Sequence, residues 1–453
     1  MGGKYQRYSE VKLSGIPWVL DELPSHWHVL PAFSVLKEEQ IKNTDGKETN
    51  VLSLSYGNIK TRDVESNAGL LPASFDTYQK VWPGDIVLRL TDLQNDKRSL
   101  RVGRSSLKGI ITSAYLKLKA SKDIDDRYLY RLLHSYDTSK VFYGMGGGLR
   151  QSLKFEDFRR LPIIVPPVDE QKNIANFLDH EIAKIDSLIA NQEKLIELLK
   201  EKRQAVISHA VTKGLNPDVS MKDSGIKWLG EVPEHWKACT LRRLILEMEQ
   251  GKSPECESQP ADNNEWGVLK TSCVNHGSYR PNENKKLPEN IEPHIKYEVK
   301  KGDLLMSRAS GSPSLIGSVA LVENDAPMKL LSDKIFRIKT ESEVSNNYFF
   351  WLMQSDAMRE QIVQSISGAE GMANNITKSA IVDFAAVLPP MKEQNEIAVK
   401  IKIETGRFSK LIEKASEQLL LLTERKSSLI SAAVTGKIDV RHWHSARKEE
   451  VHV

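Results

Sequence analysis

One segment in the first half of the chain is rich in cationic and amide side chains. It follows Gly84-Asp85 and carries five Arg and Lys against two Asp. Arg, Lys, Asn and Gln form the paired hydrogen bonds that read base edges, and cations also bind phosphates. The segment therefore predicts a surface that contacts nucleic acid, with a solvated hairpin face as the alternative. The candidate residues are Arg89, Gln94, Asn95, Lys97, Arg98, Arg101 and Arg104.

Further short segments carry the same residue types. The candidates in them are Tyr143, Arg150, Gln151, Lys270, Arg280, Arg308, Ser310, Asn374 and Asn375. Gln151 and Asn374 share a position of an internal repeat, 223 residues apart. Arg308 has no arginine partner in that repeat, because Ser307 corresponds to Arg89. This mismatch leaves the roles of both arginines open.

The sequence lacks the common motifs of catalysis. The Asn/Asp-Pro-Pro-aromatic tetrad of base methylation is absent, since the two Pro-Pro pairs follow Val165 and Leu388. Gly251-Lys252-Ser253 resembles the end of a phosphate loop, but Leu246 stands where the leading glycine belongs. His-Glu-x-x-His and Gly-x-Ser-x-Gly do not occur either. We therefore expect a binding protein without catalytic residues or a bound metal.

Length and composition narrow the class of protein. A chain of 453 residues is long for one core and suggests two or three domains. The net charge of +4 permits nucleic-acid binding but does not argue for it. No apolar run reaches the ~18 residues of a membrane span, and the N-terminus lacks the apolar core of a signal peptide. We expect a cytoplasmic protein without membrane contact, whose three cysteines are reduced thiols.

The chain repeats itself once, and a repeat of this size indicates two like structural units. Four anchors occur twice in the same order. They are Ser-Gly-Ile-x-Trp at 14–18 and 224–228, Pro-x-His-Trp at 24–27 and 233–236, Gly-Asp at 84–85 and 302–303, and Pro-Pro-x-x-Glu-Gln at 166–171 and 389–394. We expect the anchor tryptophans in the core. The sequence between the anchors differs greatly, as in a module that reads one ligand in two different parts; neutral drift is the alternative.

A long helix is predicted after each Pro-Pro pair. Proline disfavours helix before it, and Asp169 is an N-cap residue type. Apolar residues then recur at steps of four and three for about five heptads, interrupted by Gln192 and Arg203. About 40 residues at 1.5 Å each would make a rod of about 60 Å. The predicted pairing residues are Ile182, Ile185, Ile189, Ile196, Leu199, Phe408, Ile412, Leu419 and Leu422.

An apolar stripe of this length needs a partner helix. The nearest partner is the other copy in the same chain, because each helix is followed by a break, at Gly214 and Pro217 and at Gly436. Two quasi-equivalent units would then pack their helices antiparallel, with the globular halves at opposite ends. A homodimer seam, or packing of each helix on its own domain, is the alternative.

This order of anchors, each present twice, resembles the specificity subunits of type I restriction-modification systems. The resemblance covers residues 8–437. It implies an α/β (α+β) fold in which two mixed α/β target-recognition domains are separated by two long helices that pair as an intramolecular antiparallel coiled coil. The expected segments are the first target-recognition domain at 1–168, the first helix at 169–213, a linker and the second domain at 214–391, the second helix at 392–436 and a charged tail at 437–453.

The resemblance also implies a function. Each domain would read one half of a split, asymmetric site in double-stranded DNA, and the helices would fix the gap between the halves. Two modification subunits would supply adenine methylation and the restriction subunits ATP-dependent cleavage. S-adenosylmethionine, ATP and magnesium would then belong to those partners. The alternative is a coiled-coil scaffold that joins two protein-binding domains without DNA contact, which leaves the cation-rich segment unexplained.

Overall fold

The chain forms two compact units. The computed structural model describes residues 5–19, 22–64, 74–96, 99–145, 152–226, 229–366 and 374–444. Unit 1 comprises residues 1–193 and 417–453, and unit 2 comprises residues 194–416. Each unit therefore contains one globular domain together with half of each long helix.

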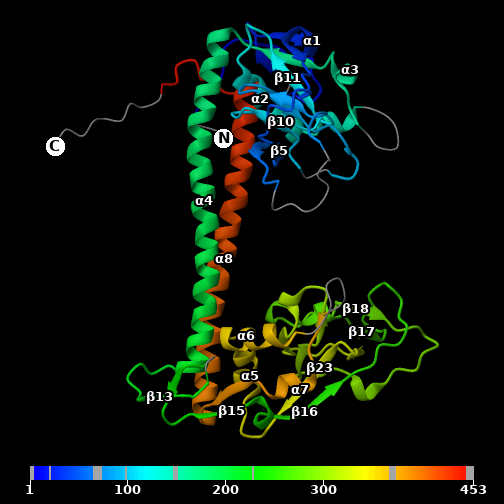
Figure 1. Ribbon diagram of the computed structural model, residues 1–453, viewed down its shortest axis with the longest axis vertical. Helices are drawn as coiled ribbons and strands as arrows, with labels where there is room; N and C mark the ends of the chain where they lie inside the picture. Colours follow the sequence, from blue (N-terminus) through cyan, green and yellow to red (C-terminus); the bar gives the residue numbers. More distant parts are fainter. Residues whose placement is uncertain are drawn as a thin grey trace, which may run out of the picture. The chain divides into compact units, whose positions relative to one another are not determined.

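The two long helices are α4 (Val168–Lys213) and α8 (Met391–Val434). Each begins directly after its Pro-Pro pair, and the carbonyls of Pro167 and Pro390 accept hydrogen bonds from the amides four residues on, both at 3.0 Å. In each unit the two helices run side by side in opposite directions (Figure 1). No described helix carries an apolar stretch long enough to span a bilayer.

Each long helix ends at a glycine in the left-handed region. Gly214 has φ 79° and Gly436 has φ 73°, a conformation that stops a helix and favours glycine. An added Cβ would come within 3.3 Å of the Trp236 ring at Gly214 and within 3.2 Å of the Trp27 ring at Gly436. Both rings are fully buried, as predicted, whereas Trp18 is partly exposed. Trp228 lies outside the described residues.

The helices pair along the predicted seam within each unit. In unit 1, Ile182 and Ile185 are buried in one core with the last turns of α8, and Lys426 Nζ lies 2.6 Å from Asp186 Oδ1. In unit 2, Ile207 shares a core with Ile401. The other predicted pairing residues are partly exposed, as expected for a seam of only two helices: Ile189, Ile196, Leu199, Phe408, Ile412, Leu419 and Leu422.

Short strands and helices make up the two globular domains. In unit 1 they are β1 (Val11–Leu13), β2 (Glu22–Pro24), β3 (His28–Pro31), α1 (Ala32–Val35), β4 (Leu36–Glu38), β5 (Leu52–Ser55), β6 (Asn58–Thr61), β7 (Gln79–Val81), β8 (Ile86–Leu88), β9 (Val102–Arg104), β10 (Gly109–Ile111), β11 (Leu116–Ala120), α2 (Asp126–Thr138), η1 (Val141–Gly144), α3 (Phe155–Phe158) and β12 (Pro162–Val165).

In unit 2 they are β13 (Met221–Asp223), β14 (Glu231–Pro233), β15 (Lys237–Thr240), η2 (Leu241–Arg243), β16 (Ile245–Gln250), β17 (Gly267–Leu269), η3 (Thr271–Gly277), β18 (Asn284–Lys286), η4 (Ile295–Tyr297), β19 (Leu304–Ser307), β20 (Ala309–Ser310), η5 (Pro313–Leu315), β21 (Val319–Leu321), β22 (Lys329–Leu330), β23 (Ile335–Thr340), α5 (Asn346–Met353), α6 (Asp356–Ser365), β24 (Asn374–Asn375), α7 (Lys378–Val382) and β25 (Ala385–Leu388).

The two domains share one arrangement, which we call the frame. A four-stranded antiparallel sheet has the order β4-β11-β8-β9 in unit 1 and β16-β23-β19-β21 in unit 2. The pairs β1-β2 and β3-β12 recur as β13-β14 and β15-β25. The predicted fold class, two mixed domains and two long antiparallel helices, is confirmed.

A buried tyrosine joins both long helices to each domain. The Tyr128 hydroxyl lies 3.0 Å from the carbonyl of Ile164 and 3.3 Å from that of Val434. In unit 2 the Tyr348 hydroxyl lies 3.0 Å from the carbonyl of Val387 and 3.3 Å from that of Val211. The strand that leads into one helix and the last turn of the other are thus tied at one point.

Unit 1 contains a buried histidine whose titration we expect to affect stability. Burial lowers the pKa of His134 to about 4, and the positive charge of Arg131 contributes to this shift. Between about pH 6.5 and 4 the unfolded chain takes up a proton that the folded chain does not, so the free energy of unfolding should fall by up to ~3 kcal/mol as pH drops through this window. Above about pH 6.5 His134 should contribute no pH dependence.

The frame supplies the matched variant, because Gln354 occupies the position of His134 in unit 2. In thermal unfolding of the full chain, we expect the melting temperature of His134→Gln to change less between about pH 7 and pH 5 than that of the natural protein. Parallel curves for the two proteins would show that His134 is not the titrating group.

Candidate nucleic-acid interface

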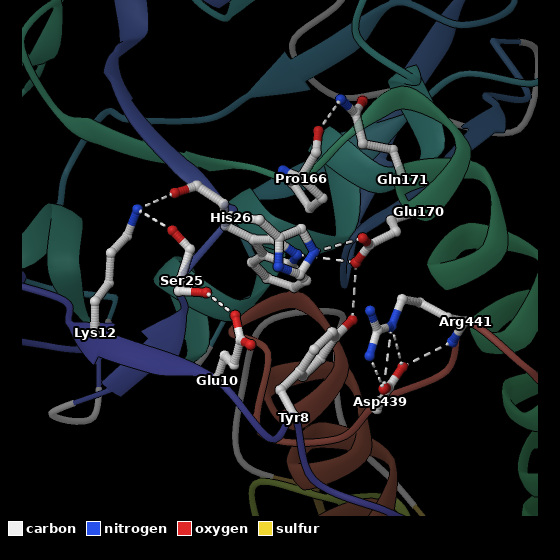
Figure 2. A network of polar contacts seen from close by, with 11 residues as sticks. Tyr8, Glu10, Lys12, Ser25, His26, Pro166, Glu170, Gln171, Asp439 and Arg441 are labelled. Carbon is white, nitrogen blue, oxygen red and sulfur yellow. Dashed lines mark hydrogen bonds and ion pairs between the residues drawn. The ribbon is translucent and has the colours of Figure 1, made fainter.

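The glutamate at the start of α4 binds the N-terminal segment of unit 1. Glu170 accepts hydrogen bonds from Trp27 Nε1 at 2.9 Å and from the Tyr8 hydroxyl at 3.0 Å, and His26 Nε2 lies 2.6 Å from it (Figure 2). Burial, and then the Glu170 carboxylate, raises the pKa of Tyr8, so its hydroxyl remains a donor. We call these four residues the Glu170 cluster.

Unit 2 repeats this cluster with two donors. Glu393 accepts from Trp236 Nε1 at 2.9 Å, and His235 Nε2 lies 2.7 Å from it. The Pro-x-His-Trp and Glu-Gln anchors are therefore one structural feature, in which a Trp and a His meet the first turn of a long helix. They stabilise the frame.

The glutamine that follows each glutamate is fully buried and joins two helix starts. Gln171 accepts from the amide of Asp125, the N-cap of α2, at 2.9 Å and donates to the carbonyl of Pro166 at 2.9 Å. Gln394 does the same with the amide of Ser345 at 2.8 Å and the carbonyl of Pro389 at 2.9 Å. This anchor also belongs to the frame.

The aspartate of each Gly-Asp turn belongs to a buried ion cluster. In unit 1, Lys117 Nζ lies 3.6 Å from Asp85 and 3.2 Å from Glu39, with its side chain fully buried. In unit 2, Arg337 lies 3.0 Å from Asp303 and also pairs with Glu249. These buried ion pairs hold the Gly-Asp turn in place. This turn sets the point where the following segment leaves the sheet.

Arg101, a predicted nucleic-acid contact, is fully buried. Its Nη1 donates to the carbonyls of Arg89 at 3.0 Å and Thr91 at 2.8 Å, its Nη2 to that of Asp96, and its Nε to the Tyr143 hydroxyl at 2.9 Å. These hydrogen bonds occupy the guanidinium and hold the loop between β8 and β9. The prediction that Arg101 contacts nucleic acid is therefore wrong; it positions the loop that carries the other candidates.

The remaining unit 1 candidates differ in exposure. Gln94 and Asn95 are exposed at the turn of this loop, and Arg89 is partly exposed. Arg104 is ion-paired with Asp126. Tyr143 is partly exposed and has Lys140 Nζ 4.7 Å from its ring centroid. Outside the described residues lie Lys97, Arg98, Arg150 and Gln151.

In unit 2 the fold brings two predicted segments together. Strand β20, with Ser310, pairs with β24, formed by Asn374 and Asn375, and the amide of Ile376 donates to the carbonyl of Arg308 at 2.9 Å. All four candidates, Arg308 included, are partly exposed. Lys270 precedes η3, and exposed Arg280 donates to the carbonyl of Ser272, within η3, at 2.8 Å.

The two units settle how Arg89 relates to Arg308. In unit 1 the amide of Leu153 donates to the carbonyl of Leu90 at 2.9 Å, the counterpart of the bond between Ile376 and Arg308. Arg308 therefore occupies the position of Leu90. Arg89 is one residue earlier, and neighbouring residues of an extended chain point to opposite sides. The two arginines are not equivalent.

The hairpin β5–β6 is a candidate that sequence reasoning missed. Tyr56 (φ 47°) and Gly57 (φ 77°) form its two-residue turn, and the Tyr56 side chain is 74% exposed. Positive φ at both residues is the turn that fits the twist of paired strands, but for Tyr it is strained, and such strain gathers at functional sites. Asn58 and Lys60 are also exposed. A two-stranded ribbon of this kind fits the DNA major groove.

The two like units, each joined to the same pair of long helices, define a duplicated two-domain protein. Comparisons with known proteins identify its family. The family model for the type I restriction modification DNA specificity domain matches residues 109–199 and 233–420, more than half of the chain. The chain therefore belongs to this family.

Curated relatives agree with this. The chain is 31% identical to the type I restriction enzyme EcoEI specificity subunit of Escherichia coli over 49% of this chain and 38% of that subunit. It is 28% identical to the EcoKI specificity subunit of Escherichia coli strain K12 over 68% of this chain and 64% of that subunit. These matches span less than two thirds of either relative.

A chain in a structure on complex assembly and conformational transition of the type I R-M system has a TM-score of 0.66 and 15% identity, and covers 92% of this chain and 99% of its own. At this identity the likeness establishes the fold alone.

Proposed function

We propose that this chain is the DNA-reading subunit of a type I restriction-modification system, in which each unit reads one part of a split, asymmetric site. The observation that carries the proposal is a single frame built twice with two different exposed loop sets. Glu170 and Glu393 fix like elements in both units, so differences in sequence fall on the loops.

The exposed loops of the two units suit different base sequences. Unit 1 presents the β5–β6 hairpin and the loop held by Arg101. Unit 2 presents the β20–β24 pair and the segment around η3. Direct readout depends on which Arg, Lys, Asn and Gln side chains reach base edges. Two loop sets of different composition would therefore read two unlike half-sites.

The chemistry of such a system would lie with partner subunits. Two modification subunits would bind S-adenosylmethionine and methylate adenine, and restriction subunits would use ATP and magnesium. This chain would contribute the DNA site and the surfaces on which these subunits assemble. Family membership and the absence of catalytic motifs from the sequence support this division.

Methylation mapping tests the proposal. The full chain would be co-expressed with the modification and restriction subunits of its host, and modified bases located by single-molecule sequencing. We expect a split motif with one modified base in each half and an unread gap. Exchange of residues 222–391 for those of a relative should change one half only. A partner complex that forms without methylation or DNA binding would favour the protein scaffold instead.

The hairpin provides a finer form of the same test. Tyr56→Ala combined with Lys60→Ala should weaken binding to the natural site about 10- to 100-fold, since a good base contact is worth about 1–3 kcal/mol. Recognition of the other half-site should persist. Lys122→Ala, which removes an exposed lysine elsewhere in unit 1, is the charge-matched control. Equal affinities for both variants would exclude the hairpin from the interface.

A further inference from the structure

A cationic pocket of about 400 Å³ lies in unit 2, where the C-terminal half of α4 meets α6 and the end of η3. Its lining includes three permanent cations, Lys200, Arg203 and Arg359, and one carboxylate, that of Asp356. The helical pattern also marks the site, because Arg203 occupies a position of the seam where an apolar residue is expected.

The three cations of this pocket form no ion pair with an acid within the described parts of the chain. Arg203 Nε is buried without a hydrogen-bond partner, and neither Arg203 nor Lys200 has an ion-pair partner within the described parts of the chain. The carboxylate of Asp356 accepts from the Ser208 hydroxyl at 2.8 Å and keeps its charge, so the lining carries three cations against one anion. Arg359 donates to the carbonyls of Ile316 and Pro313, at 2.6 and 2.7 Å, and not to an acid.

Unit 1 provides the comparison, because the repeat places Lys426 where unit 2 has Arg203. Lys426 pairs with Asp186 at 2.6 Å, whereas the position of Asp186 in unit 2 is occupied by Ser409. The frame therefore does not require an unpaired cation at this point of the helix pair. Within the described residues, the cation is paired in unit 1 and unpaired in unit 2, and a buried donor without a partner is costly unless a ligand satisfies it.

We propose that this pocket binds a phosphate of the DNA backbone, so that helix α4 itself contacts the duplex in addition to the recognition loops. The inference rests on the proposed function. The guanidinium of Arg203 and the ammonium of Lys200 supply charge-assisted donors, and the hydroxyls of Ser314 and Ser318 on the lining supply neutral ones. Among the described residues the lining holds no Phe, Tyr or Trp and one imidazole, that of His276, so it suits a phosphate group better than a stacked nucleotide.

The ligand and its source follow from the elements involved. Arg203 extends from α4 and Arg359 from α6, and side chains that contact phosphates fix register without reading sequence. Such a contact would hold unit 2 on the duplex while the β20–β24 pair reads bases. The same chemistry would also accept free inorganic phosphate, and the test separates the two sources.

The test compares a double variant, which carries both Arg203→Gln and Lys200→Gln, with the natural full chain. Each protein is measured in complex with its modification subunits. Affinities for the recognised duplex and for an unrelated duplex would be measured by fluorescence anisotropy over a series of salt concentrations. We expect about a 5- to 10-fold loss for both duplexes and a salt slope shallower by about one, the value of one phosphate contact, with the recognised motif unchanged. Lys426→Gln removes one charge at the matching position of unit 1 and should leave the slope unaltered.

Each other outcome has a definite meaning. If the natural protein binds its site and the double variant has the same affinity and slope, this inference is overturned and the proposed function stands. If the natural complex does not bind DNA, the proposed function itself fails. If inorganic phosphate raises the melting temperature of the DNA-free protein, and the double variant loses that effect without a change in DNA affinity, the pocket is a free-anion site.

A variant that keeps the charge separates contact from packing. Arg203→Lys should retain most of the salt slope. If Arg203→Lys and Arg203→Gln lose DNA affinity equally and both lower the melting temperature, Arg203 acts through packing of α4 and the inference is overturned.

Discussion

Replacement of Arg101 by methionine is expected to lower the free energy of unfolding of unit 1 by about 3 kcal/mol or more, because it leaves several buried carbonyl groups without a donor. Methionine keeps an unbranched stem like that of arginine and supplies no hydrogen-bond donor. The carbonyls of Arg89, Thr91 and Asp96 would lose the guanidinium that orients them. The loop between β8 and β9 should therefore open locally even where the rest of unit 1 stays folded.

Hydrogen exchange followed by mass spectrometry would measure this. Peptides within residues 86–104 should lose protection in Arg101→Met, and denaturant unfolding should give the loss of stability. Arg104→Met is the matched control, three residues away on β9, where a partly exposed ion pair with Asp126 is worth about 1 kcal/mol or less. If the two variants exchange and unfold alike, Arg101 does not organise the loop.

Because Arg101 is buried, its effect on DNA binding should be indirect. Arg101→Met is expected to weaken binding to the natural site more than to unrelated DNA, since the loop that it orders carries the exposed amides of Gln94 and Asn95. A direct phosphate contact would weaken both equally. The ratio of the two affinities, measured by fluorescence anisotropy, distinguishes a positioning residue from a contact.

Arg101 also shows where sequence reasoning reached its limit. Composition identified a segment of cations and amides, but it could not distinguish an arginine that faces solvent from one that satisfies carbonyls. That difference depends on β9 pairing with β8 and on Tyr143, more than forty residues away. The hairpin β5–β6 was missed because Tyr-Gly is a weaker turn signal than Asn-Gly, and the left-handed Tyr56 is set by the fold.

The frame was more accessible from sequence. Heptad spacing is local, so the seam residues Ile182 and Ile185 could be assigned from their spacing alone, as could the breaks at Gly214 and Gly436 from their residue type. The anchors revealed the duplication but not their contacts. His26 and Glu170 are 144 residues apart, and only the fold places them together. A repeat indicates that two positions are equivalent, and it does not say what each one touches.

The contacts of these anchors lead to an expected difference between the two units. Glu170→Gln should lower stability by about 3–5 kcal/mol and Glu393→Gln by about 2 kcal/mol, since a hydrogen bond to a charged group contributes about 1.5–3 kcal/mol. A glutamine has one acceptor oxygen, and its amide would face a donor. Three side chains hydrogen-bond to the Glu170 carboxylate, which is 12% exposed. Two side chains do so at Glu393, which is 35% exposed. Water therefore compensates more readily at Glu393.

Calorimetric unfolding of the full chain would compare the two variants, and Tyr8→Phe identifies the origin of the difference. Tyr8 is the donor that unit 2 lacks in its described cluster. Arg441 Cζ also lies over the Tyr8 ring, 4.9 Å from its centroid. Tyr8→Phe keeps the ring and removes the hydroxyl. If the hydroxyl causes the difference, Tyr8→Phe combined with Glu170→Gln should cost less than the sum of the single changes, because the amide of Gln no longer opposes that donor. Strict additivity would instead assign the greater loss at Glu170 to its deeper burial.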